Sequence, residues 1–172
     1  MNVTVVPFGN ARLKNGKVTC QHGDDECKGN RWEQCAISHA FGNSSSSFAF
    51  IYCMEMAGDN MLSHVTKCAG EASLDYKALS TCFAGPESDK LQKKAAADTP
   101  ANHQYVPWVV VDGKHSAAAE NSYKGLVTSV CAAYKGGAKP KECSNSELDK
   151  EDSAKTTSKC LEQIELTLLP GF

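Results

Sequence analysis

Nine cysteines constrain this 172-residue chain more than any other feature of its sequence. Neighbouring cysteines lie at least seven positions apart, so the sequence contains no CxxC pair. So many thiols are rare in a reducing compartment unless they bind metal, which usually requires closely spaced pairs. We therefore expect a disulfide-stabilised protein of an oxidising compartment. The nine are Cys20, Cys27, Cys35, Cys53, Cys68, Cys82, Cys131, Cys143 and Cys160.

An odd number of cysteines leaves at least one that stays free or bridges two molecules. Cys160 lies in the polar C-terminal segment and is our candidate for a disulfide-linked homodimer. The sequence does not specify how the other eight pair.

The charge balance excludes two classes of partner. Lys and Arg (18) nearly balance Asp and Glu (20), so the chain has no basic field for nucleic acid or an anionic membrane surface. No apolar run approaches the roughly 18 residues of a membrane span. We expect neither nucleic acid nor membrane as a partner.

Two sequons, at Asn2 and Asn43, agree with an oxidising lumen and are candidate glycosylation sites. The first twenty residues have no basic start and no long apolar core, so we expect no signal peptide in this chain. To reconcile the two observations, we expect the chain to begin inside a longer protein, at an internal methionine or a truncation point.

The first half predicts a strand, a hairpin turn and then helices. Val3–Val6 is a β-branched run that stops at Pro7, and Lys14–Lys17 contains an Asn-Gly turn signal. Apolar periodicity predicts a helix over about 31–40, starting at an Asn30 cap. Further helices are predicted around 48–56, from an Asp59 cap, from a Ser73 cap as far as Gly85, and on the surface over 87–98.

The second half returns to β-type composition before one clear helix. The run at 105–111 predicts a strand, and Asp112-Gly113 predicts a hairpin turn after it. Apolar residues from Tyr123 to Tyr134 recur at helical spacing and are followed by two glycines. Residues 138–172 are interpreted as a polar tail pinned by one or two cysteines.

The stretch CQHGDDECKGNRWEQC, residues 20–35, allows a metal site, a redox centre or a disulfide staple. Structural zinc and dithiol sites both favour CxxC, which this stretch lacks. A stapled loop with a tight turn at Gly23 is the interpretation that fits its spacing. We expect no metal.

Other chemistries have weaker support. No GxSxG elbow and no phosphate loop occur, and the histidines have no partner that the sequence identifies. Pro107 is either an edge-strand proline or a cis-proline at a tight turn.

These residues resemble the gamma-interferon-inducible lysosomal thiol reductase family. The family signature CQHGxxECxxNxxxxC matches residues 20–35 at every fixed position. VVPFGNA at 5–11 and YVPW at 105–108, followed by DGK at 112–114, are similar to family segments, and five later cysteines fall where relatives have theirs. The resemblance covers about residues 2–143.

The resemblance implies an α/β fold, thioredoxin-like with a helical insertion at about 28–100, in a domain of residues 1–137. It implies no cofactor, disulfide-containing protein substrates, a lysosomal or secreted (endomembrane lumen) location, and structural disulfides among Cys20, Cys27, Cys35, Cys53, Cys68, Cys82, Cys131 and Cys143. The family's CxxC precedes the segment NVTVVPFGNA, on a first strand and first helix that this chain lacks. Only Val106, Pro107 and Trp108 carry over, as a substrate-facing cis-proline loop, and no catalytic residue does.

We therefore expect a thiol-disulfide oxidoreductase by family, acting on protein disulfides at acidic pH, that is inactive as this chain because the CxxC is absent. The alternative is a non-catalytic, secreted, disulfide-stabilised protein-binding domain. Loss of the first strand would leave two apolar strands without their shared neighbour. We expect upstream residues, a different pairing, or another chain to fill that place.

Overall fold

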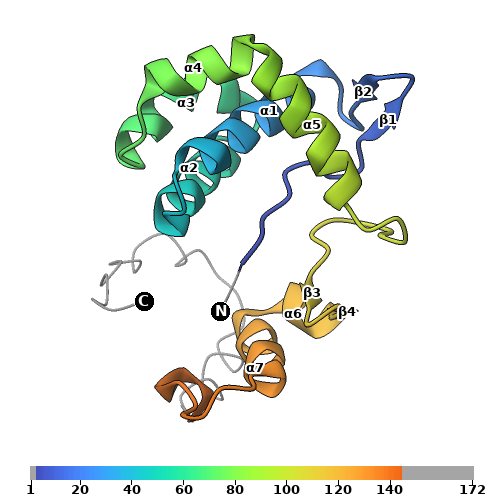
Figure 1. The fold of residues 1–172 in the computed structure, drawn as a ribbon, viewed down its shortest axis with the longest axis vertical. Helices are drawn as coiled ribbons and strands as arrows, with labels where there is room; N and C mark the ends of the chain where they lie inside the picture. The colour runs from blue at the N-terminus through green and yellow to red at the C-terminus, as the bar shows by residue number, and fades with distance from the viewer. Residues whose placement is uncertain (1–2, 145–172) are drawn as a thin grey trace. The chain divides into compact units, whose positions relative to one another are not determined.

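The computed structural model describes residues 3–144 and shows a mixed α/β chain that is mostly helical. It divides into two compact units, one ending at Pro107 and one beginning at Trp108, and each is described here by itself (Figure 1). The predicted boundary at residue 137 stays a prediction. Asn2 and Cys160 lie outside the described residues.

The first unit begins with the hairpin that the sequence predicts. Strands β1 (Arg12–Lys14) and β2 (Lys17–Thr19) pair antiparallel. The two turn residues, Asn15 and Gly16, have φ values of 51° and 75°. Two positive φ angles are what a tight two-residue hairpin needs, and Asn-Gly is the pair that adopts them most easily.

The predicted strand at Val3–Val6 is wrong. These residues form no strand, and Val3 is 47 % exposed. A strand needs a hydrogen-bonded neighbour, and none of the described strands pairs with this segment. β-Branched composition alone therefore did not produce a ladder.

Helix α1 (Asp24–His39) begins earlier than predicted. Three acidic residues in its first turn favour a helix N-terminus by their charge. Asn30 is therefore not a cap. It lies inside the helix, and its side-chain amide donates a hydrogen bond to the carbonyl of Phe8.

Four helices follow: α2 (Ser44–Met56), α3 (Met61–Glu71), α4 (Tyr76–Ala84) and α5 (Pro86–Asp98). Two predicted caps are wrong. Asp59 lies in the short 3₁₀ helix η1 (Gly58–Asn60), and α3 has no side-chain cap. Ser73 has φ of 56°, and Asp75 caps α4 instead by accepting from the Lys77 N–H.

The core of this unit lies where α1 contacts α2, α3 and α4. Phe50, Met54 and Leu79 are fully buried there, and Cys35, Cys68 and Cys82 are almost fully buried with them. Trp32 stacks on Phe83 with ring centroids 4.3 Å apart. Helix α5 also packs on α1, and its buried positions are Ser88, Gln92 and Ala95.

The second unit contains strands β3 (Val110–Val111) and β4 (Lys114–His115), helices α6 (Ala117–Asn121) and α7 (Tyr123–Ala133), and the 3₁₀ helix η2 (Lys141–Ser144). The hairpin at Asp112-Gly113 is present, but the predicted strand shortens to two residues. Helix α7 is where periodicity predicts it, although it ends at Ala133, with Tyr134 as its C-cap, rather than at the glycines.

The strands of residues 3–144 form two separate two-stranded antiparallel sheets. The thioredoxin-like sheet therefore stays an interpretation. No described helix combines the length and the hydropathy of a membrane span.

Candidate functional site

A disulfide between Cys20 and Cys27 closes the start of the signature stretch. Their Cα atoms lie 5.6 Å apart, and the bond joins the end of β2 to the first turn of α1. Gly23, between them, has φ of 98°, a conformation that L side chains rarely adopt. Sulfurs in a disulfide cannot act as thiolate ligands, so this loop is a staple.

The polar signature residues are engaged in local contacts. The Glu26 carboxylate accepts the backbone N–H of His22 at 2.5 Å, and the His22 ring lies 3.2 Å from the same oxygen. The Gln21 side-chain oxygen Oε1 accepts from the Asn10 side-chain amide at 2.7 Å. These bonds hold the stapled loop and connect it to the turn at residues 7–10.

Helix α1 holds that turn from a second side. The amide of Asn30 donates to the carbonyl of Phe8 at 3.4 Å, and the amide of Gln34 donates to the carbonyl of Pro7 at 2.7 Å. Phe8 is buried, in a small cluster with Ala11 and Ala95. The polar residues at the fixed positions of the signature thus hold the stapled loop and the turn together. Among the described residues, none of them is placed as a nucleophile.

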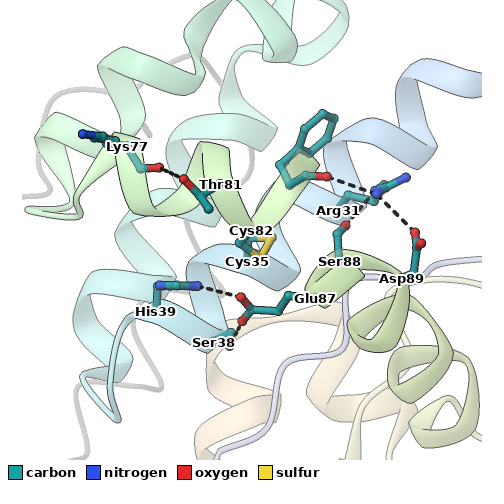
Figure 2. Close-up of a disulfide and its surroundings, with 11 residues drawn as sticks. Arg31, Cys35, Ser38, His39, Lys77, Thr81, Cys82, Glu87, Ser88 and Asp89 are labelled. Carbon is teal, nitrogen blue, oxygen red and sulfur yellow. Dashed lines mark hydrogen bonds and ion pairs between the residues drawn. A yellow bond between two sulfur atoms is a disulfide. The ribbon is translucent and has the colours of Figure 1, made fainter. Parts of the chain in front are cut away.

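The signature ends at Cys35, which forms a disulfide with Cys82 of α4. Both side chains are almost fully buried. Figure 2 shows this bond between two polar clusters. In one, Arg31 donates to Ser88 Oγ at 2.7 Å and contacts Asp89 at 3.3 Å. Arg31 therefore joins α1 to the start of α5.

The second cluster is Ser38, His39 and Glu87. The Ser38 hydroxyl donates to Glu87 at 2.9 Å, and His39 Nε2 lies 3.3 Å from the other carboxylate oxygen (Figure 2). The Ser38 hydrogen bond is the main cause that lowers the pKa of Glu87, with a smaller contribution from His39. Donor atoms of His39, Cys82 and Glu87 lie within 4.8 Å of one another. The Cys82 sulfur is in the disulfide, so two donors remain, too few for a metal site.

Glu33, also in the signature stretch, is a buried carboxyl group. Its residue is 4 % exposed, and its Oε1 has no hydrogen-bond partner among the described residues. Burial raises the pKa of Glu33 to about 9, and the charge of Glu55 on α2 and a hydrogen bond to it add to the shift. Glu33 is therefore protonated in the folded protein at neutral pH.

Two further disulfides complete the set. Cys53 pairs with Cys68, which joins α2 to α3, and Cys131 pairs with Cys143, which joins α7 to η2. The prediction of disulfide bonds is confirmed, and all eight cysteines of residues 3–144 are paired. The pairing itself could not be read from the sequence.

The segment around Pro107 is the other region that the sequence singles out. Of the two readings of Pro107, the structure contains the cis Val106–Pro107 bond, and Val106 is 52 % exposed. The next residue, Trp108, stacks on His115 of β4 with ring centroids 3.6 Å apart and planes 7° apart. An exposed aliphatic side chain and a stacked ring pair thus flank the proline in the chain.

Sequence reasoning missed the partner of His115. Its Nε2 lies 2.8 Å from Glu120 Oε1, and the same oxygen accepts the Val109 backbone N–H at 2.8 Å. The Glu120 side chain is 5 % exposed. Ser116 caps α6 by accepting from the Ala119 N–H, so an N-cap signal followed by a glutamate was the available clue.

His64 and His103, for which the sequence identified no partner, have local contacts. His64 Nδ1 lies 3.0 Å from the Asn60 carbonyl, and His103 Nδ1 lies 2.8 Å from the Pro100 carbonyl. Neither is placed against a nucleophile.

Comparison with known proteins identifies the family that the chain resembles. Residues 1–72 match the family model described as gamma interferon inducible lysosomal thiol reductase (GILT). The chain is 37 % identical over 153 residues to a gamma-interferon-inducible lysosomal thiol reductase of Carassius auratus, with 83 % of this chain and 59 % of the relative covered. It is 38 % identical over 150 residues to a gamma-interferon-responsive lysosomal thiol protein of Arabidopsis thaliana (84 % and 62 % covered).

A third relative, the gamma-interferon-inducible lysosomal thiol reductase of Mus musculus, is 34 % identical over 156 residues, with 84 % of this chain and 59 % of the relative covered. The chain thus spans about three fifths of the length of these curated relatives. The family model covers the signature, and the 83–84 % of the chain that aligns with these relatives is long enough to extend past Pro107. The chain belongs to the gamma-interferon-inducible lysosomal thiol reductase family.

Proposed function

We propose that this chain is part of a thiol-disulfide oxidoreductase that reduces protein disulfides at acidic pH in a lysosomal or secreted, luminal setting. In this proposal residues 3–144 supply a disulfide-braced scaffold and a substrate-facing loop, and the redox dithiol is not among them. One observation carries the proposal: a family signature is present in full, while every described cysteine is held in a disulfide.

Disulfide reduction needs a thiolate that attacks one sulfur of the substrate and a second thiol that resolves the mixed disulfide. Such a pair has to be close enough to bridge, as in CxxC. The Cys35–Cys82 pair is buried in the core, which prevents contact with a protein substrate. We therefore infer that these 172 residues alone do not turn over protein disulfides.

The substrate-facing role is proposed for Val106, Pro107 and Trp108. Support comes from two separate observations: Val106 is exposed, and Trp108, which follows Pro107 in the chain, forms a ring pair with His115. An exposed apolar side chain and a flat ring surface are each suited to contact an extended peptide segment around a cystine. We further propose that the fold is thioredoxin-like, on the family resemblance. A crystal structure in which the β3–β4 hairpin joins a larger central sheet supports this, and a β3–β4 hairpin that stays a separate two-stranded sheet overturns it.

The test is insulin reduction at about pH 5, followed by precipitation of the freed B chain. The 172-residue chain is compared with any longer form that its gene encodes. We expect turnover from a longer form that carries a CxxC and none from the 172 residues. Turnover by the 172 residues alone would contradict the proposal, because a described disulfide would then have to act as the dithiol.

A second candidate function is binding without turnover, favoured by the exposed Val106 and Tyr105 in a chain whose described thiols are all oxidised. To distinguish this function from reduction, a disulfide-containing peptide is titrated into the protein while the fluorescence of Trp108 is followed. Saturable binding, together with a gene whose longest product lacks CxxC, supports the binder. Binding that disappears in a Val106→Asp variant would assign it to this loop.

A further inference from the structure

The junction between α1 and α2 exposes a phenylalanine. Phe41 is 89 % exposed, the most exposed of the large apolar side chains in residues 3–144. Its φ of 49° is in the left-handed region, which is uncommon for a bulky residue. Single exposed apolar residues are ordinary, but Phe41 is unusual because it lies two residues before the Asn of a sequon.

Asn43, two residues later, is the acceptor residue of the Asn-Ser-Ser sequon and is exposed. Its side-chain oxygen accepts the Ser46 N–H at 3.3 Å and so caps α2. Its amide nitrogen has no hydrogen-bond partner within residues 3–144. A sugar bonded to that nitrogen would leave the capping oxygen in place, so modification and helix capping are compatible.

Phe41 and Asn43 line the same open hollow, of about 280 Å³, with Ser46, Ser73 and Asp75 among its other lining residues. Its wall combines an aromatic ring with hydroxyl and carboxylate oxygens. A pyranose ring has the matching character, because one face presents C–H groups and its rim presents hydroxyls. The electron-rich face of an aromatic ring attracts such C–H groups.

We propose that Asn43 carries an N-linked glycan and that the ring of Phe41 packs against the first N-acetylglucosamine. The co-reactant is a lipid-linked oligosaccharyl diphosphate. Asn43 Nδ2 forms a bond to sugar C1, the C1–O bond to the diphosphate breaks, and the lipid diphosphate leaves with the electron pair while Nδ2 gives up one proton. The inference requires the luminal setting proposed above, but not reductase activity.

The packing predicts that the first sugar stabilises the fold only when Phe41 is present. We expect it to raise the unfolding midpoint by about 3 °C, the size that one aromatic contact produces in a domain of this length. In a Phe41→Ser variant the same sugar should have little effect.

The experiment uses the full chain, secreted from eukaryotic cells with a leader and with Asn2→Gln to leave one sequon. Mass spectrometry measures occupancy at Asn43. One sample is trimmed to the first N-acetylglucosamine, and another is deglycosylated completely, which leaves Asp at position 43, an equally good N-cap. Calorimetry then compares the midpoints of the two samples in the parent and in Phe41→Ser.

Tyr52→Ser is the matched control, because Tyr52 is an exposed aromatic residue on α2 (53 %) nine positions from Asn43. We expect it to retain the full sugar-dependent shift. An unoccupied Asn43 overturns the inference, and so does a sugar-dependent shift of the same size in Phe41→Ser. Because insulin reduction is not measured, failure of the proposed reductase function leaves this result unaffected.

Discussion

Residues 3–107 and residues 108–144 bury their apolar side chains to different extents. In the first range, helices α1 to α4 enclose fully buried Phe50, Met54 and Leu79, and three disulfides cross this region. In the second range Ala119 is the one described apolar residue that is buried, and one disulfide is present. Both regions nevertheless contain helices with clear apolar periodicity.

Apolar periodicity is often taken to predict both the position of a helix and its burial, and the two regions show that these are separate properties. Helix α7 has the cleanest apolar spacing in the chain, yet none of its residues is buried, and Tyr123 is 61 % exposed. Periodicity is a property of one segment, whereas burial requires a partner surface. The apolar spacing therefore predicted the position of α7 correctly, but it did not predict whether α7 is buried.

The largest expected effect comes from the disulfide inside the first core. Replacing Cys35 and Cys82 by alanine should lower the free energy of unfolding of residues 3–107 by about 4 kcal/mol, because the bond closes a loop of 47 residues and its sulfurs fill core volume. Each region has one tryptophan, so ¹⁹F NMR of fluorotryptophan protein in denaturant follows each separately. The Trp32 signal reports this change.

The control is the double variant of Cys131 and Cys143, whose loop is 12 residues. Loop entropy alone gives about 3 kcal/mol there, and the change should be reported by Trp108. If this variant instead shifts the Trp32 transition as strongly, the division into two regions is wrong.

The next effect depends on pH and tests the first core from within. Between pH 4.5 and about 9 the folded state keeps the Glu33 proton that the unfolded state releases, so stability falls as the pH rises through this range. Glu33→Gln has no proton to release. Its free energy of unfolding should match that of the parent near pH 4 and exceed it near pH 8 by on the order of 3 kcal/mol. Urea unfolding at both pH values measures the difference.

Glu87→Gln is the matched control of opposite sign. The pKa of Glu87 is lowered, so its contribution is present above the unfolded pKa and is lost on acidification. Because the Glu87 side chain is 43 % exposed, Glu87→Gln should change the free energy of unfolding by less than about 1 kcal/mol. A parent whose stability does not depend on pH between 5 and 8 would rule out a protonated Glu33.

A smaller effect is expected in the second region, where one carboxylate holds several groups. Glu120→Ala removes the carboxylate oxygen that the Val109 N–H and His115 Nε2 contact and should lower the free energy of unfolding by about 1–3 kcal/mol in the Trp108 transition. Asp112→Asn is the control, since it removes only an exposed ion pair with Lys135 and Asn also tolerates positive φ. Equal losses in both variants would mean that burial of Glu120 does not matter.

Local signals in the sequence predicted local structure well. Asn15-Gly16 specified its hairpin, and apolar spacing placed α7, because both depend on neighbours in the chain. The start of α1 was missed for the same reason. Asn30 has the residue type of a cap, but it lies inside α1, and its side chain donates to the distant Phe8 carbonyl. The helix predicted around 48–56 is present as α2, but its buried residues are Ser47, Phe50 and Met54.

The candidate site was less predictable because its contacts are long-range. The signature marked residues 20–35 as special, but the pairing of Cys35 with Cys82, 47 positions away, has no local signal. The partner of His115 was missed although it lies five positions on, because the sequence does not show that Glu120 is buried. The strand at 3–6 was wrong because its composition could not supply a partner strand.

The smallest expected effect on stability belongs to a cysteine outside both described regions. All eight cysteines of residues 3–144 are paired within the chain, which leaves Cys160 as the ninth and as the proposed link between two copies. Cys160→Ser should leave both tryptophan transitions within about 0.5 kcal/mol of the parent, because it breaks none of the four described disulfides. On non-reducing electrophoresis it should remove a dimer band that reductant also removes. A dimer band that persists in Cys160→Ser would show that another cysteine exchanges its intramolecular partner for one in a second copy, and the pairing described above would then not be complete in solution.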